Sequence, residues 1–258
     1  MFVSCLVVTM VSVACSRSGE IESAAAKPIV VCSALDNKPI EYREEDDSKA
    51  AGLGIDLLDQ IARASGREIF VKSTSRSAQF TWLADGKCNV IASSLTADEV
   101  VKGGAVASEA YYHDDLVVLG RAGEGHDSPD VNSLNGRKVG VVRDSTADRY
   151  LIAANFPGAN IRRYPAAADT FAALNVNRLH TDAGVEAVLG DIAALSFRAS
   201  KDSNLTVGPR IDTQRTFHYA VRSDDADSLS RLNDGLAGLA MTGVLTEVNN
   251  TYLEKYVP

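Results

Sequence analysis

The sequence predicts an α/β protein of two lobes, each a mainly parallel sheet flanked by helices. Apolar runs of strand length alternate with amphipathic runs of helix length, an order typical of parallel sheets with crossover helices. The alternation occurs in two successive waves, and two extended segments, 115–121 and 217–222, join them. We therefore expect two crossings between the lobes, with residues 27–116 and 217–258 in the first lobe and 120–214 in the second.

The first wave begins with a short apolar strand and a turn. A helix then starts near Gly54, carries one apolar face and is closed by Gly66 at its C-cap position. The acidic run 41–47 is interpreted as a solvated loop. The expected elements are the strand 28–32, the helix from Gly54, the strand 69–71, a short helix around Phe80 and Leu83, and a strand that begins at Val90.

The second wave repeats this order after a loose, polar segment. Its first helix is opened by capping side chains in the run Asp144-Ser145-Thr146. The expected elements are the strands 116–119 and 138–142, a helix to Ala154, a helix capped by Asp169 and Thr170, the strand 185–189, a helix 192–197, the strand 217–221, an amphipathic helix spanning Leu229 to Leu239 and a last helix within 243–256.

The composition excludes several classes of partner. A formal charge of -8 and a pI near 5.1 argue against nucleic acid, because a phosphate backbone requires a basic face. The four histidines are scattered, without the spacing of metal ligands. We expect no nucleic-acid partner, no metal and no cofactor.

The first 14 residues are uncharged and largely apolar, and they are too short to remain as a membrane-spanning helix. We interpret residues 1–14 as an export signal peptide. The run Ser12-Val13-Ala14-Cys15 resembles a bacterial lipobox, although leucine is usual where Ser12 stands. Cys15 is therefore a candidate lipidation site, and residues 15–26 read as a flexible tether at the extracytoplasmic face of a bacterial membrane. The alternative is ordinary secretion with Cys15 free or paired.

Hydroxyl side chains follow the strand that begins at Val90. Ser93, Ser94 and Thr96 stand where the carboxyl end of a buried parallel strand opens into a ligand crevice. Such a cluster suits a polar ligand. The alternative is that these hydroxyls only satisfy the backbone of a turn.

The same stretch, Asp-Gly-Lys-Cys-Asn-Val-Ile-Ala-Ser-Ser-Leu-Thr at 85–96, resembles a signature of the family 3 periplasmic solute-binding proteins. Further matching motifs occur in the family's order. The resemblance implies a two-lobed periplasmic-binding-protein-like fold, a hinge at the crossovers and a monomer that delivers a small polar solute, an amino acid or a similar amine, to the permease subunits of an ABC importer. The motifs are Gly-Ile-Asp-Leu-Leu at 54, Ser-Leu-Asn-Gly-Arg-Lys-Val-Gly-Val at 133, Val-Glu-Ala-Val-Leu-Gly-Asp at 185 and Leu-Ala-Met-Thr-Gly-Val-Leu at 239.

The resemblance also assigns candidate ligand-binding residues. Asp191 matches the aspartate that binds the ligand ammonium, although an aspartate at a helix start is often only a cap. The arginine that usually binds the ligand carboxylate falls on Val101, and the glycine of the family's Gly-Ser-Thr turn is Asp144. The remaining candidates are Ser93, Ser94, Thr96 and Thr146 as hydroxyl contacts, Arg76 and Arg143 as replacement guanidinium groups, Asn37 where an aromatic residue is common, and Tyr111 and Tyr112 near the cleft mouth.

Cys32 and Cys88 remain once the signal peptide is removed and Cys15 is acylated. They resemble a cysteine pair in binding-protein-like subunits found beside quinoprotein dehydrogenases. Strands one and three of such a sheet are neighbours and export permits disulfides, so we expect a Cys32–Cys88 bond. The alternative is two buried, unpaired thiols.

Two other functions compete with import. A periplasmic accessory or sensory subunit of the quinoprotein-associated type is the first. The second is an enzyme on the same fold, for which Glu99 or Glu109 would be the acid or base. Neither glutamate belongs to a recognisable catalytic constellation, so we do not expect an enzyme.

Overall fold

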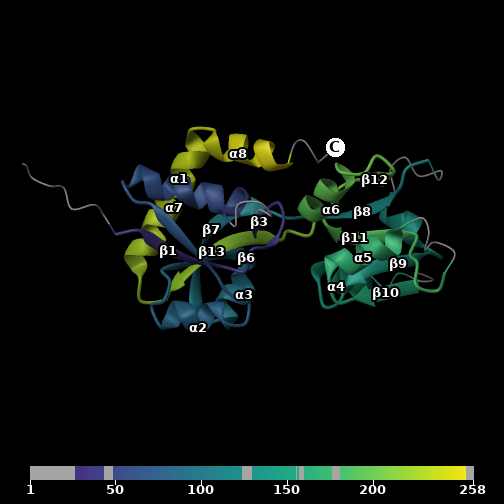
Figure 1. The fold of residues 1–258 in the computed structure, drawn as a ribbon, viewed down its shortest axis with the longest axis horizontal. Coiled ribbons are helices and arrows are strands. Elements are labelled where there is room, and N and C mark those ends of the chain that lie inside the picture. The colour runs from purple at the N-terminus through teal and green to yellow at the C-terminus, as the bar shows by residue number, and fades with distance from the viewer. Residues whose placement is uncertain are drawn as a thin grey trace, which may run out of the picture.

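The computed structural model describes residues 27–43, 49–123, 130–154, 156, 160–175 and 181–253. Two α/β lobes lie side by side, and the C-terminal helices return to the first of them (Figure 1). Within the described ranges, no helix is both long and apolar enough to cross a membrane. The predicted signal peptide, the tether and Cys15 lie outside the described residues.

The first lobe is built on a five-stranded sheet of order β5-β1-β6-β13-β7. β1 pairs in parallel with β5 and β6, whereas β13 runs antiparallel to β6 and β7. The sheet is therefore mainly parallel, as predicted: β5, β1, β6 and β7 run in one direction, and β13 runs against them because it returns from the other lobe. The strands are β1 (Ile29–Ser33), β5 (Ile69–Ser73), β6 (Val90–Leu95), β7 (Ala105–His113) and β13 (Thr216–Arg222).

Helices cover both faces of this sheet. Figure 1 shows α1, α7 and α8 on one face and α2 and α3 on the other. The apolar stripe of α1 is buried as predicted, and Gly66 follows the helix with φ +68°. The helices are α1 (Leu53–Ala64), α2 (Gln79–Ala84), α3 (Ala97–Lys102), α7 (Ala226–Met241) and α8 (Val244–Leu253).

A small sheet of β2 (Asp36–Asn37), β3 (Glu41–Arg43) and β4 (Ala50–Ala51) lies before α1. The sequence interpretation of 41–47 as a solvated loop is wrong for Glu41, whose side chain is fully buried. Gly52 holds this sheet against α1. A Cβ at Gly52 would stand 2.5 Å from the Ile40 carbonyl oxygen, and its φ of +119° suits only glycine.

The second lobe repeats the plan with the sheet order β10-β9-β11-β8-β12. Side chains of β8 alternate between two buried clusters, one against α4 and one against α5 and α6, so helices cover both faces of this sheet as well. The elements are β8 (Leu116–Arg121), the 3₁₀ turn η1 (Val131–Leu134), β9 (Lys138–Val142), α4 (Thr146–Ala153), β10 (Asn160–Tyr164), α5 (Ala167–Leu174), β11 (Ala187–Asp191), α6 (Ile192–Ala199) and β12 (Leu205–Val207).

The predicted fold class, a two-lobed α/β protein, is confirmed. The first crossover lies at Asp114 and Asp115, slightly before the expected boundary at 116, because Leu116 already belongs to the second sheet and its core. The second crossover is the segment 208–215 between β12 and β13.

Cys32 and Cys88 form a disulfide, as predicted, with their Cα atoms 5.8 Å apart. Cys32 lies on β1, and Cys88 precedes β6, the neighbouring parallel strand. Both residues are fully buried among the side chains that α2 and α3 pack on this face of the sheet.

Replacing both cysteines by alanine is expected to lower the free energy of unfolding by about 4 kcal/mol, the chain-entropy value for a loop of this size. Denaturant titration of wild type and the double variant measures this difference. An unchanged titration midpoint would show that the bond does not constrain the unfolded chain.

Candidate functional site

Three charged residues from three segments meet where the lobes join. Arg215 Nη1 donates to Asp114 Oδ2 and to Asp191 Oδ1, each at 2.9 Å. Asp114 belongs to the first crossover, Arg215 to the second, and Asp191 ends β11. We call these residues the hinge cluster. It holds two carboxylates for one guanidinium group.

Burial decreases across the hinge cluster towards Asp191. The Asp114 side chain is 0% exposed, that of Arg215 18% and that of Asp191 29%. Burial, and then the nearby Asp191 charge, raises the pKa of Asp114 well above its usual range. Asp191 stands before α6 but makes no capping hydrogen bond. Its carboxylate is therefore directed to the hinge cluster rather than to the helix.

A second polar cluster lines the first lobe around Glu41. Ser94 Oγ lies 2.6 and 2.8 Å from the two carboxylate oxygens of Glu41 and donates to them, and Asn37 Nδ2 donates to Ser94 Oγ at 2.8 Å. Burial raises the pKa of Glu41 to about 8, although the Ser94 hydrogen bond and the Arg76 charge act in the opposite direction. At neutral pH, the Glu41 carboxyl group is therefore close to its pKa.

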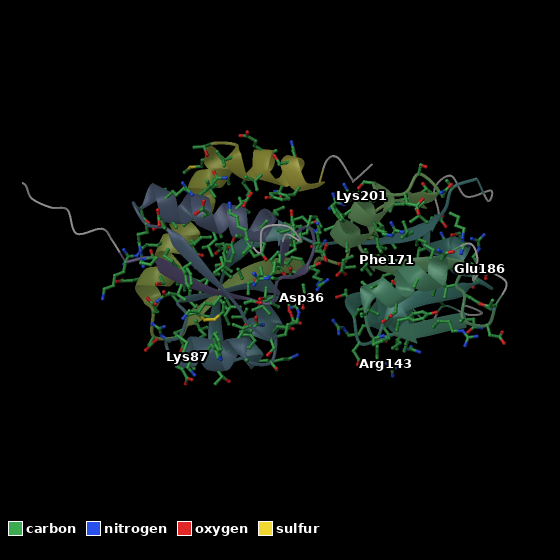
Figure 2. All side chains as sticks on the ribbon, in the orientation of Figure 1. Asp36, Lys87, Arg143, Phe171, Glu186 and Lys201 are labelled. Atoms are coloured by element: carbon green, nitrogen blue, oxygen red, sulfur yellow. A yellow bond between two sulfur atoms is a disulfide. The ribbon has the colours of Figure 1, made fainter. Side chains whose placement is uncertain are left out.

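Arg76 lies at the outer edge of this cluster. Its Nε and Nη2 donate to the two carboxylate oxygens of Asp36 at 2.9 and 2.7 Å, and its Nη1 donates to the Ser93 carbonyl at 2.9 Å. Figure 2 shows Asp36 at the edge of the first lobe that faces the second. The Arg76 guanidinium is thus already engaged with a carboxylate of the protein.

The predicted hydroxyl contacts have different surroundings. Ser93 Oγ is buried and accepts from the Ala34 N–H at 3.0 Å. Thr96 caps α3 in a capping box with Glu99. Thr146 is the first residue of α4 and is half-buried. The Ser93 and Thr96 contacts fit the alternative that these groups satisfy local backbone, while ligand binding by all the hydroxyls stays a prediction.

The second-lobe candidates lie on the turn between β9 and α4. Arg143 and Asp144 are exposed there, and Asp144 has φ +58°, which explains why glycine suits this position. The Asp144 N–H donates to Asp148 Oδ2 at 3.1 Å. Val101, where the family arginine is expected, is 68% exposed on α3.

Two aromatic expectations need correction. Tyr111 and Tyr112 do not line the cleft mouth: they are 1% and 7% exposed and pack with Phe217 in the first-lobe core. One aromatic ring from each lobe does lie near the same lysine between the lobes. Lys38 Nζ lies 4.4 Å from the ring centroid of Tyr42 on β3 and 5.2 Å from that of Phe197 on α6.

The enzyme candidates show no catalytic pairing. Glu99 Oε2 accepts from the Thr96 N–H at 2.8 Å and from its hydroxyl at 2.9 Å, which is the geometry of a helix cap. Glu109 is exposed on β7. Among the described residues, no group of three or more His, Cys, Asp or Glu side chains could hold a metal ion.

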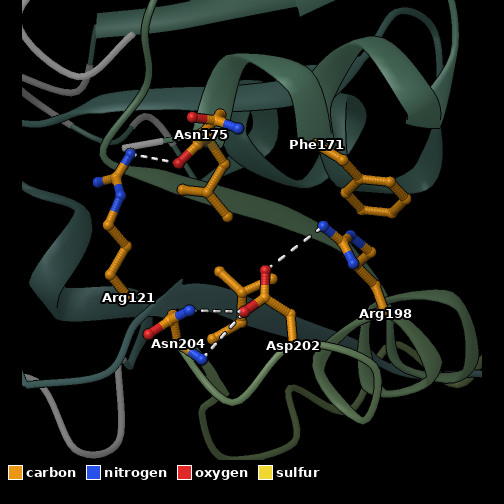
Figure 3. Close-up of a pocket in the computed structure, with 8 residues that line it drawn as sticks. Arg121, Phe171, Asn175, Arg198, Asp202 and Asn204 are labelled. Atoms are coloured by element: carbon orange, nitrogen blue, oxygen red, sulfur yellow. Dashed lines mark hydrogen bonds and ion pairs between the residues drawn. The ribbon is translucent and has the colours of Figure 1, made fainter. Parts of the chain in front are cut away.

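A cavity of about 180 Å³ lies inside the second lobe, between α5, α6, β8 and β12 (Figure 3). Its polar side chains contact one another: Arg198 lies 3.6 Å from Asp202, which also accepts from the Asn204 amide at 3.0 Å. This cavity includes none of the predicted ligand-binding residues.

Sequence reasoning missed Asp36, Glu41, Asp114 and Arg215. A carboxylate at the start of the first crossover and an arginine directly before β13 were the available signals. Pairing between Asp114 and Arg215 spans 101 residues and is not visible as a local motif.

Two α/β lobes joined by two crossovers, with charged residues of both lobes at the junction, define a hinged solute-binding protein. The chain belongs to the bacterial extracellular solute-binding proteins, family 3, whose family model matches residues 29–255. This membership confirms the family that the sequence motifs indicated.

Several relatives are binding proteins for amino acids. The chain is similar to an L-arginine-binding protein of Pseudomonas aeruginosa, at 26% identity over 238 residues with 89% of each chain covered. It resembles a probable histidine-binding protein of Neisseria gonorrhoeae at 27% identity, covering 94% of this chain and 90% of the relative. The L-cystine-binding protein TcyJ of Escherichia coli K12 is 24% identical, with 80% and 76% covered.

Solved structures share the fold. Substrate-binding domain 2 of Lactococcus lactis GlnP, in an open conformation, matches with a TM-score of 0.72 at 20% identity, covering 88% of this chain and 95% of that one. An ancestral cationic amino acid solute-binding protein gives the same TM-score, identity and coverage.

The buried Glu41 predicts a pH dependence of stability. Its pKa of about 8 in the folded protein exceeds the ordinary value of 4.5, so the folded state holds the proton more strongly. This contribution is complete below about pH 4.5 and is lost as the pH rises through 8. Glu41→Gln should therefore be more stable than wild type at pH 9 and similar to it at pH 4. Each unit of pKa difference corresponds to about 1.4 kcal/mol, so the expected difference at pH 9 is a few kcal/mol.

Denaturant unfolding at pH 4, 7 and 9 tests this expectation. The matched control is Glu109→Gln, which removes an exposed carboxylate from the same lobe. Parallel stability curves for wild type and Glu41→Gln would show that Glu41 does not titrate differently in the folded and unfolded states.

Proposed function

We propose that the protein is an extracytoplasmic receptor of an ABC importer that captures an amine-bearing small solute between its lobes. The hinge cluster carries this proposal. Its two carboxylates share the one Arg215 guanidinium group, and the Asp191 carboxylate is the one that is partly exposed. A ligand ammonium could therefore pair with Asp191.

The position of Asp191 makes such binding feasible. Its side chain is the most exposed of the hinge cluster, and it lies at the carboxyl end of β11, where ligands of parallel α/β sheets are usually bound. Asp114 is too deeply buried to contact a solute. We infer that Asp191 binds the amine directly and that Asp114 acts through Arg215.

The relatives support an amine as the common feature. The ligands in their names are arginine, histidine and cystine, which differ in their side chains but all carry an α-amino group beside an α-carboxylate. Ser94 and Asn37 on the first lobe, and Thr146 and Arg143 on the second, are the proposed additional contacts. Arg76 would contribute through its pairing with Asp36.

A second candidate function is a periplasmic accessory or sensory subunit. The Cys32–Cys88 disulfide favours it, since the resemblance to quinoprotein-associated subunits included this cysteine pair. Genes for a permease and an ATPase beside this one would favour import instead.

Calorimetry of the mature protein tests the proposed function. The probes are L-arginine, L-histidine, L-cystine, putrescine, glycine betaine and succinate. We expect amines to bind and Asp191→Asn to weaken them about 100-fold, since the ammonium then loses its charged partner. The control is Asp98→Asn, an exposed residue of α3. Tight binding of succinate that Asp191→Asn leaves intact would contradict the proposal.

We further propose that Cys15 carries a lipid anchor, with residues 15–26 as the tether. Cys15→Ala should move the protein from the detergent phase to the aqueous phase in a detergent partition, because the acyl chains provide the membrane affinity. Wild-type protein found in the aqueous phase would contradict the anchor and favour secretion.

A further inference from the structure

We propose that Arg215 is a specificity-determining residue: it makes the cleft select amines that also carry a carboxylate over amines that do not. This inference rests on the proposed function, in which Asp191 binds the ligand amine. The arginine that usually binds the ligand carboxylate is replaced here by Val101. The inference assigns the role of that arginine to Arg215 at the hinge.

The Asp191 carboxylate is already paired in the structure. Its Oδ1 accepts from Arg215 Nη1 at 2.9 Å, so an incoming ammonium arrives beside a guanidinium group. The two cations repel each other and compete for one carboxylate, in a site where solvent screening is weak because Arg215 is 18% exposed. An amine without a compensating negative charge is therefore disfavoured.

A carboxylate on the ligand reverses this effect. It would face the Arg215 guanidinium while the ammonium faces Asp191, so each charge of the ligand finds an opposite charge of the protein. Arg215 is accessible for this role, because 18% of its side chain is exposed whereas that of Asp114 is fully buried. Its Nη1 serves both aspartates.

The guanidinium is held in place without a ligand. Its central carbon lies over the Phe217 ring, 4.7 Å from the ring centroid. The buried Asp114 also forms an ion pair with it. Because Phe217 and Asp114 hold the Arg215 side chain, it keeps its position when the ligand ammonium competes with it for the Asp191 carboxylate. Arg215 is thus preorganised for the ligand carboxylate.

The other arginines near the cleft are less suited to this role. Arg76 is bidentate to Asp36 and donates to the Ser93 carbonyl, so its donors are already engaged. Arg143 is exposed on the turn before α4. Arg215 is the one of these three that donates a hydrogen bond to Asp191.

Matched ligand pairs that differ only by the carboxylate test the inference. The pairs are arginine and agmatine, histidine and histamine, and lysine and cadaverine, measured by calorimetry on the mature protein. Wild type should bind the carboxylate-bearing member of a recognised pair at least 10-fold more tightly. Arg215→Gln should reduce this preference about 10-fold or more, by weakening the amino acid and strengthening the amine.

Arg215→Lys keeps the charge and should retain most of the preference, and Arg231→Gln on the exposed face of α7 is the matched control. If Arg215 had only a structural role, Arg215→Gln would weaken the binding of both members of a pair equally. A folded Arg215→Gln with an unchanged ratio, or a wild type that binds agmatine as tightly as arginine, overturns the inference while the proposed function stands. If none of the amines binds wild type, the proposed function fails and this inference fails with it.

Discussion

The ion pairs of Arg215 with Asp114 and Asp191 are the constraint on which the rest of the structure depends. They bring together the two crossovers and the end of β11, and the Asp114 N–H donates to the Arg215 carbonyl at 2.9 Å beside them. Isolating a buried charge costs several kcal/mol, on the order of 3–5, so removal of one partner would disturb the others. The junction of the lobes and the charge of the site are therefore set by the same side chains.

The two lobes contribute differently to the cleft. On the first lobe, Glu41, Ser94, Asn37, Arg76 and Asp36 form a network in which the polar groups contact one another. This network makes a stable wall rather than a set of open contacts. On the second lobe, Asp191 keeps a partly exposed carboxylate beside the Arg215 guanidinium, and we infer that selection by charge occurs there.

The sequence predicted most of the fold because strand and helix periods are local. It located α1, β9, α4, β11 and α6 closely, since each has a clear apolar pattern. It missed β10, whose five residues include two arginines, and α3, which is short and charged. These elements form because neighbouring strands and helices supply contacts that a single-segment pattern does not contain.

The site was less predictable for a related reason. Asp191, Ser94, Asn37 and Arg76 were indicated by motifs, but their partners come from distant parts of the chain, as when Asn37 reaches Ser94 across 57 residues. Glu41 was misinterpreted because its neighbours Glu44 to Asp47 are acidic, and burial depends on packing beneath Ser94 rather than on local composition. The sequence contained these groups without showing which of them meet.

The first turn of α6 belongs to both lobes, and this has a kinetic consequence. Ala193 packs within the first-lobe core although its helix is part of the second lobe, and Phe197 meets Lys38 one turn later. A rotation of the lobes about this contact would move Asp191 little, whereas Arg143, which Figure 2 shows at the lower edge of the second lobe, away from α6, would move further. A solute would therefore meet Asp191 while the cleft is open and reach the β9–α4 turn only after closure, so different residues would govern its arrival and its escape.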